Sequence, residues 1–131
     1  MNSQPLARGV VVAHGPMARG MVEAVRRIAG DAADALEALS NEGKSPEQLK
    51  VELDAAAGDD PVVVFVDIQA GSCCMAALSS CRQRTRRVVV CGVNLPMLLD
   101  FVFHRELPIE ELVPRMLEKG RGAITQPPVP R

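Results

Sequence analysis

The chain alternates between short, continuous apolar runs and longer segments in which apolar residues recur with helical spacing. The three strongest runs, all rich in valine, are residues 9–13, 61–67 and 87–91. A strand that is apolar at every position is buried on both faces, as in a parallel sheet with helices on each side. These runs therefore predict the central strands of such a sheet. A weaker run at residues 35–39 is a further strand candidate.

Helical patterns lie between and after these runs. The first begins near Met17 and ends at Gly30, and the second opens with a capping serine, Ser45, followed by proline. Three more are expected at about 71–83, 96–103 and 109–119. Alternating β and α elements predict a three-layer αβα domain with a central, mostly parallel four-stranded sheet. This domain should span residues 1–125, before a proline-rich tail at 126–131.

Composition narrows the possible partners. The formal net charge is −1 and only three residues are aromatic, so a nucleic-acid surface is not expected. No apolar run approaches the roughly 20 residues that a membrane helix needs. Four clustered cysteines without a disulfide-scaffold spacing are typical of reduced thiols in a cytosol. We therefore expect a cytoplasmic protein without membrane insertion.

Two residues with reactive side chains follow predicted strands. His14 comes directly after the run 9–13, and Asp67 ends the run 61–67. Ligands of parallel sheets bind at the carboxyl ends of the strands, so we expect imidazole and carboxylate to be neighbours there. Unprotonated imidazole is a competent nucleophile near neutral pH. A carboxylate on its other nitrogen would fix the tautomer and stabilise charge on the ring.

Two predicted helix starts complete this candidate site. Gly15 follows His14 before the first helix, and Gly71 and Ser72 begin the third. Free N–H groups and the positive end of the dipole at a helix N-terminus favour a phosphoryl group, and the Ser72 hydroxyl can add a hydrogen bond. Phosphoryl transfer needs mainly positioning and charge stabilisation, so no metal or organic cofactor is expected. From spacing alone, however, a histidine at a strand end is more often structural or merely exposed.

Three sequence blocks resemble the IIA component of mannose-type bacterial sugar phosphotransferase systems (PTS). They are VVVAHGPMARG at 10–20, VFVDIQAGS at 64–72 and CGVNLPML at 91–98. The blocks occur in the family's order and spacing and cover essentially the whole domain. The most specific of them contains Gly-Val-Asn-Leu-Pro-Met.

The resemblance implies a phosphotransferase with a phosphohistidine intermediate, acting in sugar uptake or its regulation. His14 would be phosphorylated on Nε2, with Nδ1 facing Asp67 and with Ser72 in the phosphoryl-binding turn. The implied donor is the phosphocarrier HPr, and the implied acceptor is a separate IIB protein. The resemblance also implies a homodimer that exchanges a C-terminal edge strand, here at residues 122–125.

The chain departs from the family in the turn after Asp67. The family commonly has two glycines followed by Ser-Pro, whereas this turn has Ala70 and Gly71 followed by Ser72 and Cys73. A left-handed backbone at Ala70 would be strained, and Cys73 restores an N–H donor that proline lacks. An alternative function is therefore a regulatory binding module of the same fold. Its phosphorylation state, or the redox state of Cys73 and Cys74, would control a partner protein.

Other chemistries have less support. Cys73 would need a lowered thiol pKa at its helix start to act as a redox sensor. A zinc site built from His14 and the cysteines lacks the usual Cys-x-x-Cys spacing. A phosphoaspartate receiver domain needs acidic residues where His14 stands. A nucleotide site would need a glycine-rich fingerprint or a phosphate-loop lysine, and the sequence has neither.

Overall fold

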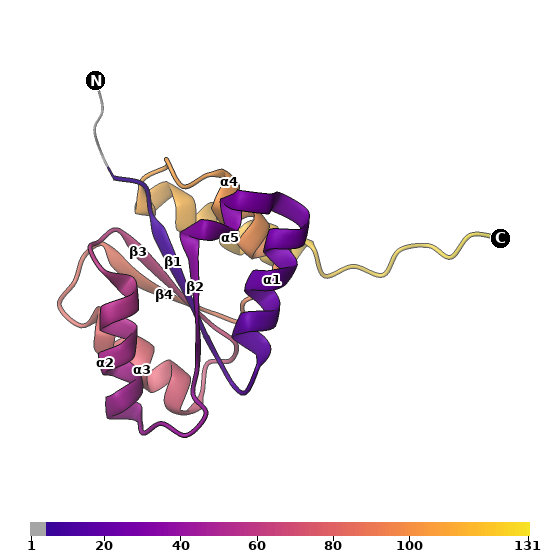
Figure 1. The fold of residues 1–131 in the computed structure, drawn as a ribbon. Helices are drawn as coiled ribbons and strands as arrows, with labels where there is room; N and C mark the ends of the chain where they lie inside the picture. Colours follow the sequence, from indigo (N-terminus) through magenta and orange to yellow (C-terminus); the bar gives the residue numbers. More distant parts are fainter. Residues whose placement is uncertain (1–4) are drawn as a thin grey trace.

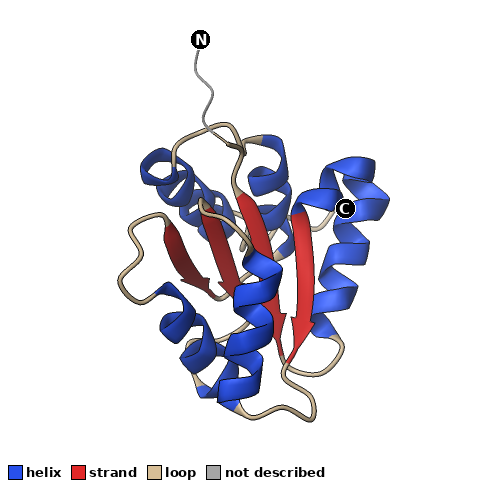
Figure 2. Cartoon of the chain, turned by 60° about the vertical axis from the view of Figure 1, so that its left-hand side comes forward, coloured by secondary structure: helices blue, strands red, loops and turns tan. Residues whose placement is uncertain are grey.

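Four parallel strands form the centre of the protein. The structure, a computed structural model, describes residues 5–131. The strands are β1 (Arg8–Ala13), β2 (Leu36–Ser40), β3 (Val62–Val66) and β4 (Arg87–Cys91), in the order β2-β1-β3-β4. All neighbouring pairs are parallel, and Figure 2 shows the four arrowheads pointing the same way. The predicted four-stranded sheet is confirmed.

Helices cover both faces of this sheet. Helices α2 and α3 lie on one face, while α1, α4 and α5 lie on the other, which gives the predicted three layers (Figure 1). A short 3₁₀ helix, η1, leads from α1 into β2. Across residues 5–131, none of the helices combines the length and the apolar character needed to cross a bilayer. Their bounds are α1 (Met17–Ala29), η1 (Gly30–Ala35), α2 (Pro46–Ala57), α3 (Gly71–Cys81), α4 (Leu95–Phe103) and α5 (Ile109–Gly122).

The continuous apolar runs pack into two separate cores. Alternate residues of β1 and β3, such as Val10 and Val64, pack with α2 and α3. Their neighbours Val11 and Phe65 pack on the opposite face, where Phe65 meets Phe101 of α4 edge to face at 5.2 Å between ring centroids. Because both faces are covered, each of these strands is apolar at every central position.

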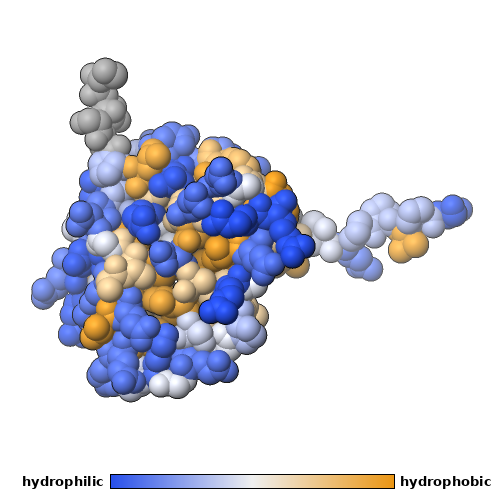
Figure 3. Space-filling view, in the orientation of Figure 1, coloured by the Kyte–Doolittle hydropathy of each residue, from blue (hydrophilic) through white to orange (hydrophobic). Residues whose placement is uncertain are grey.

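The C-terminal segment lies outside these layers. Gly122 is the last residue of α5, and residues 123–131 have no regular secondary structure. Figure 3 shows this segment standing clear of the body of the molecule, and Ile124 and Val129 are 80% and 86% exposed. Within a single chain, the strand implied at residues 122–125 is therefore not formed. Strand exchange with a second copy stays a prediction.

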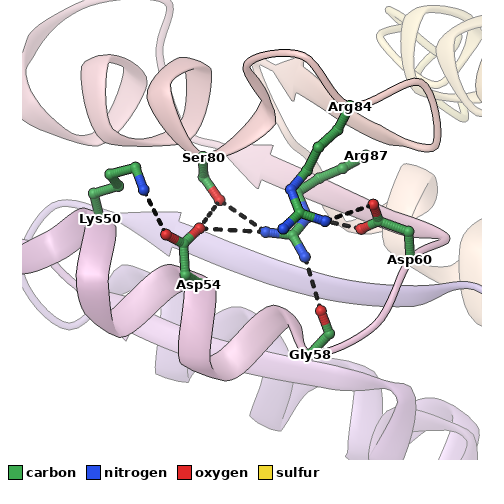
Figure 4. A network of polar contacts seen from close by, with 7 residues as sticks. All are labelled: Lys50, Asp54, Gly58, Asp60, Ser80, Arg84 and Arg87. Atoms are coloured by element: carbon green, nitrogen blue, oxygen red, sulfur yellow. Dashed lines mark hydrogen bonds and ion pairs between the residues drawn. The ribbon is translucent and has the colours of Figure 1, made fainter.

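A buried arginine at the amino ends of the strands links the sheet to the neighbouring helices. Arg87, the first residue of β4, is only 2% exposed, and Figure 4 shows the polar groups around its guanidinium. Its guanidinium donates hydrogen bonds to groups from α2, α3 and the loop before β3. They are Asp60 Oδ1 at 2.8 Å, the Gly58 carbonyl at 2.8 Å, Ser80 Oγ at 3.1 Å and Asp54 Oδ1 at 3.3 Å. Arg87 thus links both helices of one layer to the sheet.

We expect Arg87→Ala to lower the free energy of unfolding by about 3–5 kcal/mol, because it leaves a cavity and removes the buried cation to which Ser80, Asp54, Asp60 and the Gly58 carbonyl all bond. Urea unfolding at one fixed protein concentration measures this loss. The matched control is Arg84→Ala, since Arg84 is half-exposed and forms an ion pair with Asp60 at the surface. That variant should lose no more than about 1 kcal/mol. Equal losses in the two variants would contradict the role given to Arg87.

Candidate functional site

The site lies where β1, β2 and β3 end. Val12 of β1 pairs with Val66 of β3, so the chain leaves both strands at nearly the same level. His14 follows the first strand and Asp67 follows the second. The sheet register therefore brings residues that are 53 positions apart in the sequence into contact.

Asp67 holds His14 through two contacts to one oxygen. The His14 ring nitrogen Nδ1 lies 2.8 Å from Asp67 Oδ2, and the His14 backbone N–H donates to the same oxygen at 2.9 Å. The other oxygen, Oδ1, accepts from the Ile68 backbone N–H at 2.9 Å. The Asp67 side chain is 9% exposed and that of His14 is 45% exposed. The carboxylate is thus fixed inside, while the imidazole faces solvent.

These hydrogen bonds also decide the charge on Asp67. Burial on its own would raise the pKa of this carboxyl, but the hydrogen bonds from the His14 backbone, the His14 ring and the Ile68 backbone outweigh it and hold the pKa below the usual value. An ionised carboxylate can only accept, so Nδ1 must carry the proton. In the neutral imidazole, Nε2 then has the free lone pair.

The free nitrogen faces the start of α3. A Cβ atom added at Gly71 would lie 3.6 Å from His14 Nε2, and Gly71 has φ +78°, which other residues rarely adopt. Gly71 therefore keeps open the space beside Nε2, next to the free N–H groups of the first turn of α3. Ser72 is the next residue and is half-buried. Ala70 is extended, with φ −165°, so the strain considered for alanine at this position does not arise.

The loop after His14 is fixed by a residue that the sequence analysis missed. Gly15 has φ +58°, and its N–H donates to Asn41 Oδ1 at 3.2 Å. Asn41 directly follows β2, and its own N–H donates to the Ala13 carbonyl at 3.3 Å. The sequence does place Asn41 just after a candidate strand, as it does His14 and Asp67, and this position could have indicated its role.

Cys73 is the second residue whose position the sequence did not reveal. Its Sγ lies 3.9 Å from His14 Nδ1, and the residue is buried. Burial, followed by the negative charge of Asp67, raises the pKa of this thiol to about 11. A redox sensor at Cys73 would need a lowered thiol pKa, and the pKa of this thiol is raised instead.

The most specific of the three sequence blocks serves the fold rather than the site. Asn94 caps α4 by accepting from the Met97 N–H at 3.1 Å, and its amide donates to the Gly120 carbonyl of α5 at 2.9 Å. A Cβ at Gly120 would come within 2.7 Å of the Met97 side chain, so glycine permits this close contact. The block thus fixes α4 against α5.

Comparisons with known proteins agree with this architecture. The family described as "PTS system fructose IIA component" matches residues 9–116. An EIIA component of the phosphotransferase system from Streptococcus agalactiae is 22% identical, with TM-score 0.85, covering 92% of this chain and 97% of that one. A mannose/sorbose specific IIA subunit from Enterococcus faecalis is 24% identical, with TM-score 0.84 and coverages of 97% and 98%.

A third solved structure has the same fold. It is the PTS IIA protein associated with the fucose utilization operon from Streptococcus pneumoniae, at 19% identity, TM-score 0.74 and coverages of 92% and 93%. Among curated proteins, none matches the chain. Because the family match spans most of the sequence, the chain belongs to the mannose-type IIA family of PTS components.

Proposed function

We propose that this protein accepts a phosphoryl group from phospho-HPr on His14 and passes it to a separate IIB protein. Membership of the IIA family makes it a component of a sugar phosphotransferase system. One observation carries the proposal for the site: Asp67 holds Nδ1 at 2.8 Å, and Nε2 opens toward the start of α3. This arrangement suits a nucleophile that accepts a small anion.

In the proposed step, the lone pair of His14 Nε2 attacks the phosphorus of the donor phosphohistidine. The donor P–N bond breaks as the new one forms, and its electron pair returns to the donor ring. His14 keeps its proton on Nδ1, so its ring becomes positively charged. Asp67 stabilises that charge through the hydrogen bond it already makes, which avoids reorganisation during the reaction.

The phosphoryl oxygens require donors of their own. We place them against the first N–H groups of α3, where the helix dipole favours negative charge. Gly71 leaves the space for them, and the Ser72 hydroxyl is positioned to add a further donor. Gly15 contributes through its left-handed turn, which Asn41 fixes. Transfer to the acceptor runs through the same contacts in the opposite direction, in the cytoplasm where we place both partners.

We further propose that two copies exchange their C-terminal segments. Among residues 5–131, β4 pairs only with β3, so within this part of the chain its other edge has no partner strand. Exposed edges invite pairing with another extended segment. Residues 123–126 precede the first proline of the tail, and the exposed Ile124 lies among them. A copy's segment laid on β4 would cover both the edge and this side chain.

A shortened chain tests the exchange. A protein that ends at Gly122 should sediment as a monomer at concentrations where the full chain sediments as a dimer, because the pairing segment is gone. Circular dichroism should show unchanged helix content, since Gly122 ends α5. A dimer that survives this truncation would place the contact elsewhere.

The carrier function is tested by reconstitution. The full chain is incubated with enzyme I, HPr and labelled phosphoenolpyruvate, and the label is followed on this protein. We expect label that is acid-labile and base-stable, as phosphohistidine is, and that a IIB protein then removes. Label that requires neither enzyme I nor HPr would contradict the proposed donor.

A further inference from the structure

A third side chain suited to metal binding lies beside His14 and Asp67. The His14 Nδ1, an oxygen of Asp67 and the Cys73 Sγ all lie within 4.8 Å of one another. They come from three parts of the fold: the ends of β1 and β3 and the first turn of α3. The Nδ1–Oδ2 distance is 2.8 Å and the Nδ1–Sγ distance is 3.9 Å. The three atoms are therefore close enough to bind a single metal ion.

We propose that His14, Asp67 and Cys73 form a binding site for Zn²⁺. Zinc binds imidazole nitrogen, thiolate sulfur and carboxylate oxygen at about 2.0–2.3 Å, so an ion between the three atoms needs only small adjustments of the side chains. Hard cations such as Mg²⁺ and Ca²⁺ prefer sites built from oxygen, and this one offers nitrogen and sulfur as well. The ligand set therefore favours zinc.

The protons and charges balance at this site. The metal takes the place of the proton that Nδ1 shares with Asp67, and the neutral imidazole carries that proton on Nε2 instead. The Cys73 thiol, protonated in the free protein because its pKa is about 11, releases one proton to solvent. Zinc deprotonates thiols that it coordinates. Thiolate and carboxylate then neutralise both charges of the ion.

Of the three proposed ligands, His14 is the most exposed. The Asp67 and Cys73 side chains are enclosed, whereas the His14 side chain is 45% exposed, so the ion enters past the imidazole. Three protein ligands leave a fourth position for water, as in zinc sites that are not fully closed.

Metal binding has a consequence that rests on the proposed function. With zinc on Nδ1, Nε2 bears a proton and has no lone pair to attack phosphorus. Asp67 binds the metal instead, so it no longer accepts the hydrogen bond that would stabilise the charged ring. Zinc and the phosphoryl group therefore exclude each other at His14. The competition depends on Cys73, because the site has no thiolate ligand without this residue.

Cobalt and zinc titrations of the metal-free full chain test the site. Co²⁺ should bind at one equivalent with a thiolate-to-cobalt charge-transfer band, and Zn²⁺ should displace it. Cys73→Ser should abolish that band and weaken zinc binding at least about 100-fold, since even residues that only support ligands matter 10- to 100-fold. The matched control is Cys81→Ser, at the far end of the same helix, whose thiol pKa is also raised to about 11. It should bind as the unaltered chain does.

Because Cys73 is buried, the Cys73→Ser variant could lose zinc through misfolding, and a second variant at an exposed ligand tests the site independently. His14→Ala removes the exposed ligand and should weaken zinc binding to a similar extent, with an unchanged circular dichroism spectrum. Cobalt binding without the thiolate band would overturn the site. So would equal zinc affinity in the Cys73→Ser variant and the unaltered chain.

The exclusion is tested separately, by phosphoryl labelling with and without Zn²⁺. Zinc should suppress labelling of the unaltered chain and leave the labelling of Cys73→Ser as it was, which also controls for effects of zinc on enzyme I and HPr. Equal suppression in both proteins would overturn the exclusion. Failure of labelling without zinc would instead count against the proposed function, and the cobalt spectrum would still decide the metal site.

Discussion

His14→Ala is expected to take up no phosphoryl group in the reconstituted system, while the unaltered chain is fully labelled. Within residues 5–131, the variant lacks the one imidazole at the edge of the sheet where Asp67 and the start of α3 meet. One neighbouring nucleophile is the Cys73 thiol, which is buried and whose pKa of about 11 keeps it protonated. Scintillation counting of the separated protein measures the loss.

The chain supplies a matched control in its other histidine. The His104 Nδ1 lies 2.8 Å from the Asp100 carbonyl at the end of α4, on the opposite edge of the sheet from His14. Because it too sits beside an aspartate, His104→Ala separates the effect of the site from the effect of losing a histidine. Its labelling should equal that of the unaltered chain. Residual label on the His14 variant, or loss of label from the His104 variant, would show that the phosphorylated residue was wrongly assigned.

The layered fold was predictable because burial on both faces leaves a strong mark in the sequence. The runs that became β1 and β3 are apolar at every central position, since helical layers cover both of their faces. The run that became β4 is also rich in valine, although this strand lies at an edge of the sheet and is only partly buried. Strand β2 was a weaker prediction. It lies at the other edge of the sheet, and its five residues, Leu-Glu-Ala-Leu-Ser, include the exposed Glu37 and have no β-branched side chain, so its pattern is neither continuous nor typical of a strand. Local signals also placed the Ser45 cap, which forms with Gln48 as a reciprocal pair.

The site was only partly predictable, because parts of it depend on tertiary distances. Strand ends indicated His14 and Asp67, which the register brings together. The contacts of Asn41 and Cys73 with the site could be identified only from the folded structure. Asn41 follows the weak edge strand, and Cys73 points back from the first turn of α3 to the imidazole. Sequence spacing compares cysteines with one another and does not show that one of them faces a histidine 59 residues away.

Asp67→Asn is expected to slow phosphorylation of His14 by about 100- to 10,000-fold, the range seen when a group that assists proton placement on a histidine is lost. The carboxylate can only accept a hydrogen bond, so it holds the proton on Nδ1 and keeps Nε2 free. An asparagine amide can also donate to Nδ1, which moves the proton to Nε2 and blocks the attack. It also carries no charge to stabilise the phosphorylated ring. Rapid-quench measurement of label transfer from phospho-HPr gives the rate.

Glu42→Gln provides the control for charge alone. Glu42 is exposed and lies near Gly15 at the same edge of the sheet, and its side chain makes no hydrogen bond within the described residues 5–131. Removing this charge should change the rate less than about tenfold at moderate salt, because exposed charges are screened. A loss as large as that of the Asp67 variant would mean that general electrostatics governs the rate. A normal rate in Asp67→Asn would mean that the 2.8 Å contact with Nδ1 does not set the tautomer of His14.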